Sequence, residues 1–309
     1  MGGIPAAGEL DFKERKKSTL MSGPRRKRED RALPEAIKEE TLRLDLGDYR
    51  GLIAAAYYDP LILQALRSPA GLWTRAGTEV LIDKRNRVGI VRLTFSSGRP
   101  AEVALKEYSS RGVNGLKSLL LPSKAAKAWR GALALRQKGL ATAAPVAYLE
   151  KRKRGRVDSS FFLAERIESA EEVRHLFPRF PPDDLRALLA SLARHLSVCH
   201  DRGILHRDLS DGNVLVRKEP DGRLTFFLLD TNRVRVRKKI RGLARAKNLI
   251  RLGVPPAYQE SFLREYFRPR PLSKAGWLWY KMNKAVFSGY IGLKKRLRLR
   301  QIARKLGIQ

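Results

Sequence analysis

The chain has 309 residues, and 43% of them are hydrophobic, which is enough for a sizeable core and excludes a wholly disordered chain. Its 64 Lys and Arg residues outnumber 31 Asp and Glu residues, and the formal net charge of +33 favours an anionic partner such as nucleic acid, anionic lipid or a phosphorylated substrate. A single cysteine, Cys199, excludes an internal disulfide, and no run of about 18 apolar residues predicts a membrane-spanning helix. Because the N-terminus also lacks the apolar core of a signal peptide, we expect a cytoplasmic protein.

The first part of the chain predicts an arm followed by an interrupted helix. Residues 1–45 mix charged residues with Gly and Pro and predict a basic, mobile arm. Residues 49–67 predict a helix that is interrupted at Pro60.

From Gly77 onward the pattern becomes strand-like. Three short β-prone runs are separated by the turn signals DKRN and SSGRP, and they predict an antiparallel three-stranded meander. The run PSKAAKAWRGALALRQKGL has apolar residues at helical spacing and predicts a helix that ends near Gly139. Two further strands are predicted in PVAYLEKR and SSFFLAERI.

The strongest predicted helix lies in PPDDLRALLASLARHLSVCHDRGI, which opens on Pro and Asp, places Cys199 on its apolar side and ends at Gly203. The loop HRDLSDGN and a hairpin around PDGR follow. This order of elements predicts an α+β, protein-kinase-like, two-lobed fold with a truncated helical C-lobe. We expect an N-lobe over 46–165, a C-lobe over 166–270 and a tail over 271–309.

Four polar residues occur where phosphoryl transfer would need them. That reaction requires positioned phosphates, one or two Mg²⁺ ions and a carboxylate near the attacking hydroxyl. Lys106 in VALKEY matches the V-A-I-K element that contacts the phosphates of ATP. The loop HRDLSDGN supplies Asp208 as a candidate catalytic base and Asn213 as a Mg²⁺ ligand at the kinase spacing, and Asp230 ends the strand FFLLD where a second metal ligand belongs.

Further residues complete the candidate site. His206 and Arg207 would orient the catalytic loop, and Arg207 is counted among the catalytic residues. The segment AERIES contains Glu165 and Ile167, which we expect to bind ATP at a hinge, and Gly89 is the one glycine in the first hairpin, where a Gly-rich loop would lie. Each residue alone has a simpler interpretation as a solvated charge or a turn residue. Their occurrence in one order, with matching elements between them, favours a kinase-like site.

The sequence departs from the kinase pattern in two places, and the second, the missing helix Glu, favours reduced activity or a pseudokinase. The triplet DTN replaces D-F-G, and no APE-like motif follows it. No Asp or Glu occurs between Ser109 and Leu149, so the usual helix Glu that pairs with the phosphate-binding Lys is absent. Counting back from GLATAAP places Ala128 at that position.

These segments resemble the lipopolysaccharide kinase family, which includes heptose and Kdo kinases of the bacterial outer-membrane core. The similarity covers about residues 75–267 and rests on VALKEY, AWRGALALRQKGLATAAPVAYLE, FFLAERIESA, HRDLSDGNVLV and FFLLDTNR. It implies phosphorylation of a sugar hydroxyl of the lipid-linked core, with ATP and Mg²⁺, at the cytoplasmic face of the inner membrane. It carries over the four residues named above, and it implies that Arg233 contacts an anionic acceptor.

The tail, residues 271–309, predicts a basic amphipathic helix. It begins with Trp277, Trp279 and Tyr280 and continues with many Lys and Arg residues. Such a helix could lie on an anionic membrane surface, or it could pack on the C-lobe with a solvated basic face. The sequence leaves both possibilities open.

Two other functions compete with a sugar kinase. One is an atypical protein kinase of the RIO or Bud32 type, and the association of RIO kinases with RNA would use the positive charge. The other is a non-catalytic basic pseudokinase that binds lipid or nucleic acid, which the alanine at position 128 favours.

Overall fold

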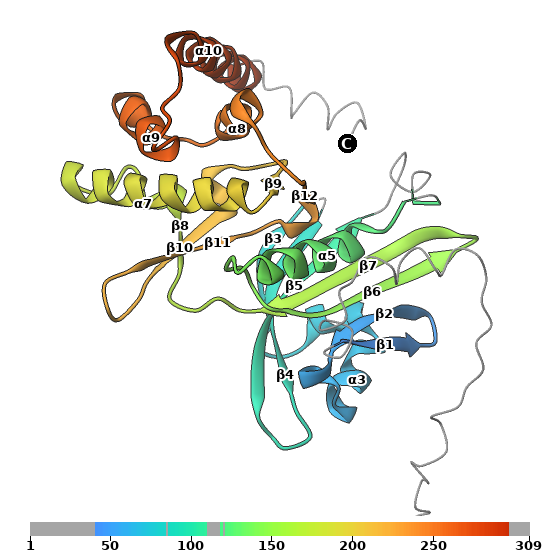
Figure 1. Ribbon diagram of the computed structural model, residues 1–309. Helices are drawn as coiled ribbons and strands as arrows, with labels where there is room; N and C mark the ends of the chain where they lie inside the picture. The colour runs from blue at the N-terminus through green and yellow to red at the C-terminus, as the bar shows by residue number, and fades with distance from the viewer. Residues whose placement is uncertain (1–40, 85, 110–117, 120, 297–309) are drawn as a thin grey trace, which may run out of the picture. The chain divides into compact units, whose positions relative to one another are not determined.

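The computed structural model describes residues 41–84, 86–109, 118–119 and 121–296, so most of the predicted arm and the last part of the predicted tail lie outside the described residues (Figure 1). The described part of the arm is a strand, β1 (Thr41–Leu46). Leucine at every second position of TLRLDL gives one face of this strand an apolar character, and Leu44 is buried. The arm prediction was therefore wrong for residues 41–45.

The predicted helix over residues 49–67 was also wrong in its first half. Tyr49–Ala54 form strand β2, which pairs with β1 and with β6. The apolar run in this segment is too short for its periodicity to separate a strand from a helix, and pairing on both edges decides the outcome. After a short 3-10 turn, η1 (Ala55–Tyr57), the helix α3 (Pro60–Leu66) begins behind Asp59, whose carboxylate accepts hydrogen bonds from the backbone N–H groups of Leu61 and Ile62.

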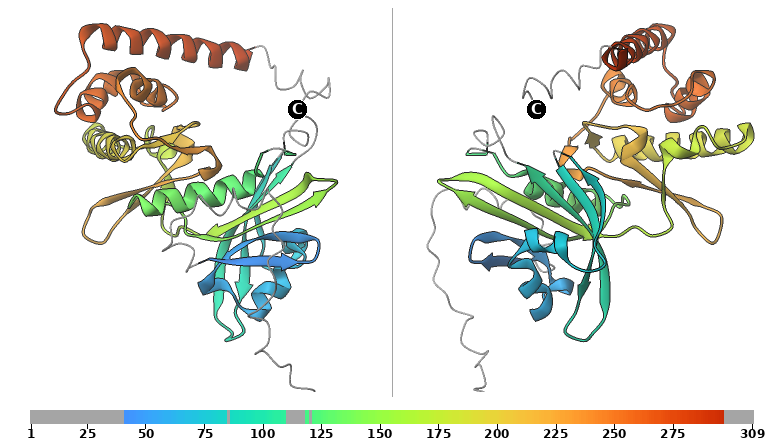
Figure 2. Two further views of the ribbon diagram at one scale, coloured as in Figure 1. Left: turned by 45° about the vertical axis from the view of Figure 1, so that its right-hand side comes forward. Right: turned by 180° about the vertical axis from the view of Figure 1, so that it is seen from behind.

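The N-lobe is built on one antiparallel sheet of seven strands in the order β1-β2-β6-β7-β5-β4-β3. After the 3-10 segment η2 (Pro69–Thr74), the remaining strands are β3 (Glu79–Asp83), β4 (Asn86–Thr94), β5 (Pro100–Ser109), β6 (Pro145–Lys153) and β7 (Arg156–Glu165). The predicted meander and the two later strands are confirmed. Helix α5 (Lys124–Gln137) packs against β6 and β7, as the green helix of Figures 1 and 2 shows.

The C-lobe begins after the hinge that follows β7. Its elements are β8 (Glu171–Glu172), α6 (Val173–Leu176), α7 (Pro182–Asp201), β9 (Ile204–His206), η3 (Asp211–Asn213), β10 (Val214–Lys218), β11 (Leu224–Leu228), η4 (Thr231–Arg233), β12 (Val234–Val236), α8 (Gly242–Leu249), η5 (Pro256–Tyr258), α9 (Gln259–Tyr266) and α10 (Lys274–Arg296). Strands β10 and β11 form an antiparallel hairpin without a register shift, and β12 pairs antiparallel with β9. The fold is thus the predicted two-lobed, protein-kinase-like α+β fold.

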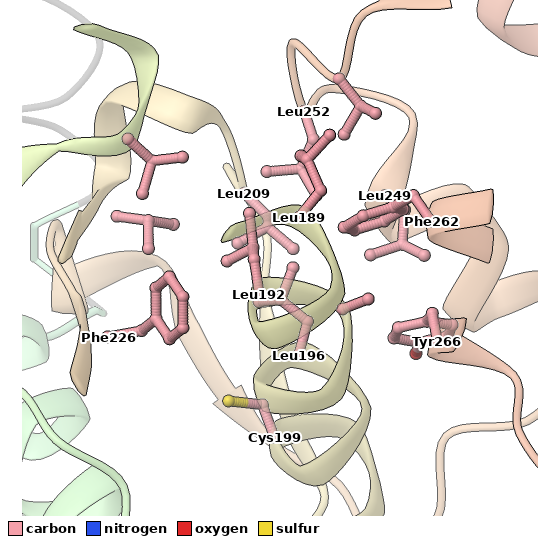
Figure 3. Packing of buried hydrophobic residues seen from close by; sticks show 14 of the residues in the cluster. Leu189, Leu192, Leu196, Cys199, Leu209, Phe226, Leu249, Leu252, Phe262 and Tyr266 are labelled. Carbon is pink, nitrogen blue, oxygen red and sulfur yellow. The ribbon is translucent and has the colours of Figure 1, made fainter. Parts of the chain in front are cut away.

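Helix α7 is the centre of the C-lobe core. Its apolar side chains contact Phe226 on one side and Leu249, Phe262 and Tyr266 on the other (Figure 3). Burying one leucine of this kind contributes about 2 kcal/mol to the free energy of folding. Cys199 lies within the same core, and burial raises the pKa of its thiol to about 12. The sulfur is therefore a core atom and not a nucleophile, as the sequence predicted.

Candidate active site

Lys106 and Asp230 form an ion pair that joins the two lobes. Lys106 lies in the middle of β5, between β4 and β7, and its ammonium group contacts Asp230 Oδ1. The same ammonium lies 5.4 Å from the ring centroid of Tyr108. Both side chains of the ion pair are about a quarter exposed, at 22% for the lysine and 28% for the aspartate. They therefore lie at the edge of solvent, where a nucleotide phosphate can reach them.

The backbone of Asp230 is left-handed, with φ of 50° and ψ of 45°. Aspartate is one of the few residues other than glycine that visits this region, although at an energetic cost. The carbonyl oxygen of Asp230 accepts a hydrogen bond from the Arg233 N–H at 2.9 Å, which closes the turn η4. This turn ends β11 abruptly and directs the carboxylate toward Lys106.

The catalytic loop connects β9 to η3 and β10. Asn213 Nδ2 donates to the carbonyl oxygen of Asp208 at 2.8 Å, and the Asn213 N–H donates to Ser210 at 2.9 Å. The Asp208 carboxylate forms a salt bridge with Arg251, with 2.8 Å between Nη2 and Oδ1. The loop therefore holds the predicted base and the predicted metal ligand in one rigid turn.

His206, the last residue of β9, links this loop to the turn that carries Asp230. Its Nε2 lies 2.9 Å and 3.2 Å from the carbonyl oxygens of Leu229 and Asp230, so Nε2 carries the proton and donates to both. Nδ1 is buried without a hydrogen-bond partner, and burial lowers the pKa of the imidazole. His206 is therefore neutral, and it ties β9 to the turn that carries Asp230.

A buried polar network extends from this histidine into the helices. Asn248 donates to the carbonyl oxygen of His206 at 2.8 Å, and its Oδ1 lies 2.9 Å from Nε2 of His200. The other ring nitrogen of His200 contacts the hydroxyl of Tyr266, to which Arg245 also donates at 2.9 Å. The catalytic loop is thus linked by hydrogen bonds to α7, α8 and α9.

Arg207 lies in a cationic cluster. Its backbone N–H donates to the carbonyl oxygen of Arg233 at 3.1 Å. Burial, together with the charges of Arg207, Arg233 and Arg237, lowers the pKa of the Arg235 guanidinium. The predicted contact of Arg233 with an anion is compatible with this cluster and stays a prediction.

The hinge and the first hairpin position the other predicted ATP-binding residues. The Glu165 side chain accepts a hydrogen bond from the hydroxyl of Tyr57 at 3.0 Å, and Ile167 is half-buried in the hinge. A Cβ on Gly89 would lie 2.4 Å from the carbonyl oxygen of Glu79 and 2.9 Å from the ring of Trp73. This close packing is a structural reason for the glycine, and the roles of these three residues in binding ATP stay predictions.

Helix α5 contacts η4 directly at Ala128, where the sequence predicts that a kinase would carry its helix Glu. Ala128 is fully buried, and its carbonyl oxygen accepts a hydrogen bond from the Thr231 hydroxyl at 2.8 Å. A Cβ on Gly131 would lie 2.0 Å from the carbonyl oxygen of Thr231. Helix α5 has no Asp or Glu, and Lys106 pairs with Asp230 instead.

The donor set fits a magnesium ion bound together with nucleotide phosphates. Asn213 donates through its amide nitrogen, which leaves the side-chain oxygen Oδ1 as a hard ligand, and Asp230 offers a carboxylate. Across the described ranges no group of three or more His, Cys, Asp or Glu side chains gathers, but Mg²⁺ commonly uses one or two protein ligands and completes its shell with phosphates and water.

Sequence motifs did not reveal Arg251 and Asn248. Each contacts the catalytic loop from a segment more than 40 residues away, with spacings of 43 residues (251 minus 208) and 42 residues. No local pattern in NLIRLGVPP marks either residue, so the folded chain was needed to find them.

Comparison with known proteins shows which proteins this chain is similar to. Residues 114–265 match the profile of the lipopolysaccharide kinase (Kdo/WaaP) family. The serine/threonine-protein kinase PknI of Mycobacterium bovis and of Mycobacterium tuberculosis is 29% identical over 87 residues, and the match spans 26% of this chain but 15% of the length of each of these relatives. A solved structure titled "WaaP in complex with acyl carrier protein" aligns with 67% of this chain and 87% of that chain, at 24% identity and a TM-score of 0.48. No helix in the described part of the chain is both long and apolar enough to cross a bilayer. The profile match over residues 114–265, together with the motifs described above, supports assignment of the chain to the lipopolysaccharide kinase (Kdo/WaaP) family.

Proposed function

We propose that the protein transfers the γ-phosphoryl group of ATP to a sugar hydroxyl, heptose or Kdo, of lipopolysaccharide core at the cytoplasmic face of the inner membrane. The observation that carries this proposal is the convergence of Lys106, Asp208, Asn213 and Asp230, which come from three separate segments: β5, the loop after β9 and the turn after β11. Phosphoryl transfer asks the protein mainly for positioning and charge, and these residues supply both.

Each residue has a role in the proposed reaction. Asp208 accepts the proton of the attacking hydroxyl, and Lys106 binds phosphate oxygens when the nucleotide takes the place of its contact with Asp230. Asn213 and Asp230 hold Mg²⁺, which when bound neutralises the charge of the β- and γ-phosphates. His206 remains neutral and holds the two loops together.

The length of the segment after Asp230 favours a sugar over a protein acceptor. Helix α8 begins at Gly242, 12 residues after Asp230, and β12 occupies part of that stretch. This leaves little chain for an activation segment that could seat a peptide. An atypical protein kinase therefore has less support than a sugar kinase. Because the chain is similar to a serine/threonine kinase, the transfer assay described below also includes a protein acceptor.

A membrane surface is the proposed location of the acceptor. Helix α10 carries five large apolar side chains that are each more than half exposed and spaced three or four residues apart: Leu278, Met282, Val286, Tyr290 and Leu293. We call this row the exposed stripe. Lys281 and Lys294 lie over neighbouring aromatic rings, at 5.1 Å from Trp277 and 5.9 Å from Tyr290. An apolar row with flanking cations suits an anionic bilayer.

A transfer assay tests the proposal. The full chain is incubated with γ-labelled ATP, Mg²⁺ and under-phosphorylated core lipopolysaccharide, with casein and RNA as other acceptors or ligands. We expect label in the lipopolysaccharide, and a loss of at least about 10³-fold in Asp208→Asn and in Lys106→Met.

The matched control is Asp221→Asn, because Asp221 is an aspartate in the exposed turn before β11 that contacts Arg223. We expect this variant to transfer label like the unchanged protein. Label in casein alone would replace the sugar-kinase proposal by a protein kinase. Absence of transfer to every acceptor, with no binding of ATP, would support the pseudokinase.

A further inference from the structure

The turn that follows α8, residues 250–253, presents Arg251 to the catalytic base. Arg251 Nη2 lies 2.8 Å from Asp208 Oδ1, and the arginine side chain is 49% exposed while the aspartate is 28% exposed. Both side chains of this ion pair are therefore open to solvent in part, so a ligand can reach them. A guanidinium has five N–H donors, so a contact with one carboxylate oxygen leaves donors for another anion.

This turn is held in place by α10. The carbonyl oxygens of Ile250 and Leu252, which flank Arg251, accept hydrogen bonds from the Lys284 ammonium at 2.7 Å and 2.5 Å. The Ile250 and Leu252 side chains are buried in the C-lobe core. Phe287, one helical turn along from Lys284, lies 5.9 Å from the Arg251 guanidinium.

The catalytic loop holds the same turn from the other side. A Cβ on Gly253 would lie 2.6 Å from Asp211 Oδ2. Burial lowers the pKa of Lys284, and the nearby charge of Asp211 acts in the opposite direction. The two hydrogen bonds of Lys284 therefore tie down the backbone on both sides of Arg251.

The catalytic loop itself offers no cation on this side. The residues between Asp208 and Asn213 are Leu-Ser-Asp-Gly, without Lys or Arg. In phosphoryl transfer, charge spreads over the equatorial oxygens of the moving group, and in some enzymes of this kind, such as GTPases, an arginine from another segment or a partner stabilises that charge.

We propose that Arg251 is a catalytic residue that binds the phosphoryl group during transfer, and that Lys284 is a positioning residue that acts through Arg251. The inference rests on the proposed function. In the step, the acceptor oxygen forms a bond to the γ-phosphorus while the bond from that phosphorus to the β,γ-bridging oxygen breaks. ADP leaves with the electron pair, the hydroxyl proton passes to Asp208, and the Arg251 guanidinium contacts the oxygens of the group in flight.

Steady-state kinetics of the full chain test the role of Arg251. We expect Arg251→Ala to lower kcat by about 10³-fold while KM for ATP stays within about twofold, because the contact forms mainly in the transition state. Arg251→Lys should recover part of the loss, and added guanidinium ion should partly restore Arg251→Ala. Arg264→Ala is the control, since Arg264 is an exposed arginine on α9 that pairs with Glu260.

A double-variant comparison tests the role of Lys284. We expect Lys284→Met to lower kcat by about tenfold, and Arg251→Ala/Lys284→Met to be no slower than Arg251→Ala, because the lysine acts through the arginine. Losses that multiply in the double variant would overturn the positioning role.

A binding measurement separates this inference from the proposed function. ADP with Mg²⁺ and aluminium fluoride, a mimic of the phosphoryl group in transfer, is titrated against the protein without acceptor. We expect the fluoride to tighten ADP binding in the unchanged chain and not in Arg251→Ala, with binding of ADP alone equal in both. If aluminium fluoride tightened ADP binding equally in both proteins, or if Arg251→Ala kept its kcat, the role of Arg251 would be overturned while the proposed function stood. If the unchanged chain labelled no acceptor, that result would count against the proposed function itself.

Discussion

Lys106 pairs with Asp230 of the C-lobe, and helix α5 offers it no acidic side chain. In the usual arrangement the helix glutamate and the metal-binding aspartate are separate groups. Here Asp230 contacts the lysine, while Ala128 lies where the glutamate would project. The departure at position 128 is therefore part of a consistent packing arrangement and is weak evidence for a pseudokinase.

Restoring the missing glutamate should damage the protein. Ala128 is fully buried, and its backbone carbonyl accepts the Thr231 hydroxyl, so Ala128→Glu would place an unpaired carboxylate into closely packed atoms. We expect a loss of about 3 kcal/mol or more in the free energy of unfolding, measured by urea denaturation. Arg136→Glu, at the exposed end of the same helix, is the control and should cost less than about 1 kcal/mol. A stable Ala128→Glu variant with faster transfer would contradict this packing argument.

His200 gives the protein a specific dependence on pH. Burial lowers the pKa of its imidazole from 6.5 to about 4, so the unfolded chain binds a proton between these values and the folded chain does not. The stabilisation is complete above about pH 6.5 and is lost as the pH falls toward 4, and its size is on the order of 3 kcal/mol. We expect the free energy of unfolding of His200→Gln to fall less between pH 7 and pH 4 than that of the unchanged chain. His175→Gln, at an exposed histidine, is the control, and equal slopes for all three proteins would refute the assignment.

Most elements were predictable because their signals are local. The meander, α5 and α7 follow from turn residues and apolar spacing, and the catalytic motifs follow from fixed distances between neighbouring residues. The strands β1 and β2 were missed because pairing across the sheet, with β6 as the partner of β2, decides their structure. Arg251 and Lys284 were missed for the same reason, since their contacts depend on how α8 and α10 pack.

The predicted packing of the tail on the C-lobe is seen for α10, whereas its contact with a membrane stays a prediction. Tyr280 is buried in the C-lobe core and stacks on Trp277 with ring centroids 5.9 Å apart, so one face of α10 packs on the protein. The exposed stripe lies on another face of the same helix. Residues Leu297, Ile302 and Leu306, which the sequence suggests as a continuation of an apolar face, lie outside the described residues.

The exposed stripe can be tested with vesicles. We expect Val286→Glu, at the most exposed of the five side chains, to reduce co-sedimentation with anionic vesicles by about tenfold, because a carboxylate opposes both insertion and charge attraction. The control is Ser288→Glu, which adds the same charge at an exposed polar position of α10. Equal losses in the two variants would mean that charge alone drives binding, and the stripe would then have no role.

The whole molecule carries a large positive charge in addition to the anion-binding sites proposed above. A net charge of +33 attracts any polyanion at low salt, and this attraction weakens as the ionic strength rises. Apolar insertion does not weaken in this way. The vesicle experiment at 0.5 M salt therefore separates binding through the exposed stripe from adsorption that RNA would share.

The contact between α5 and the turn η4 has a pharmacological consequence. The Thr231 hydroxyl bonds to the carbonyl of Ala128, and Gly131 lets the two backbones meet so closely that no side chain fits between them. A compound that needs the segment after Asp230 to swing outward would first have to pull this contact apart. Selective inhibitors should therefore be sought for the hinge beside Ile167 and for the Asp208–Arg251 face, and not for a space behind Asp230.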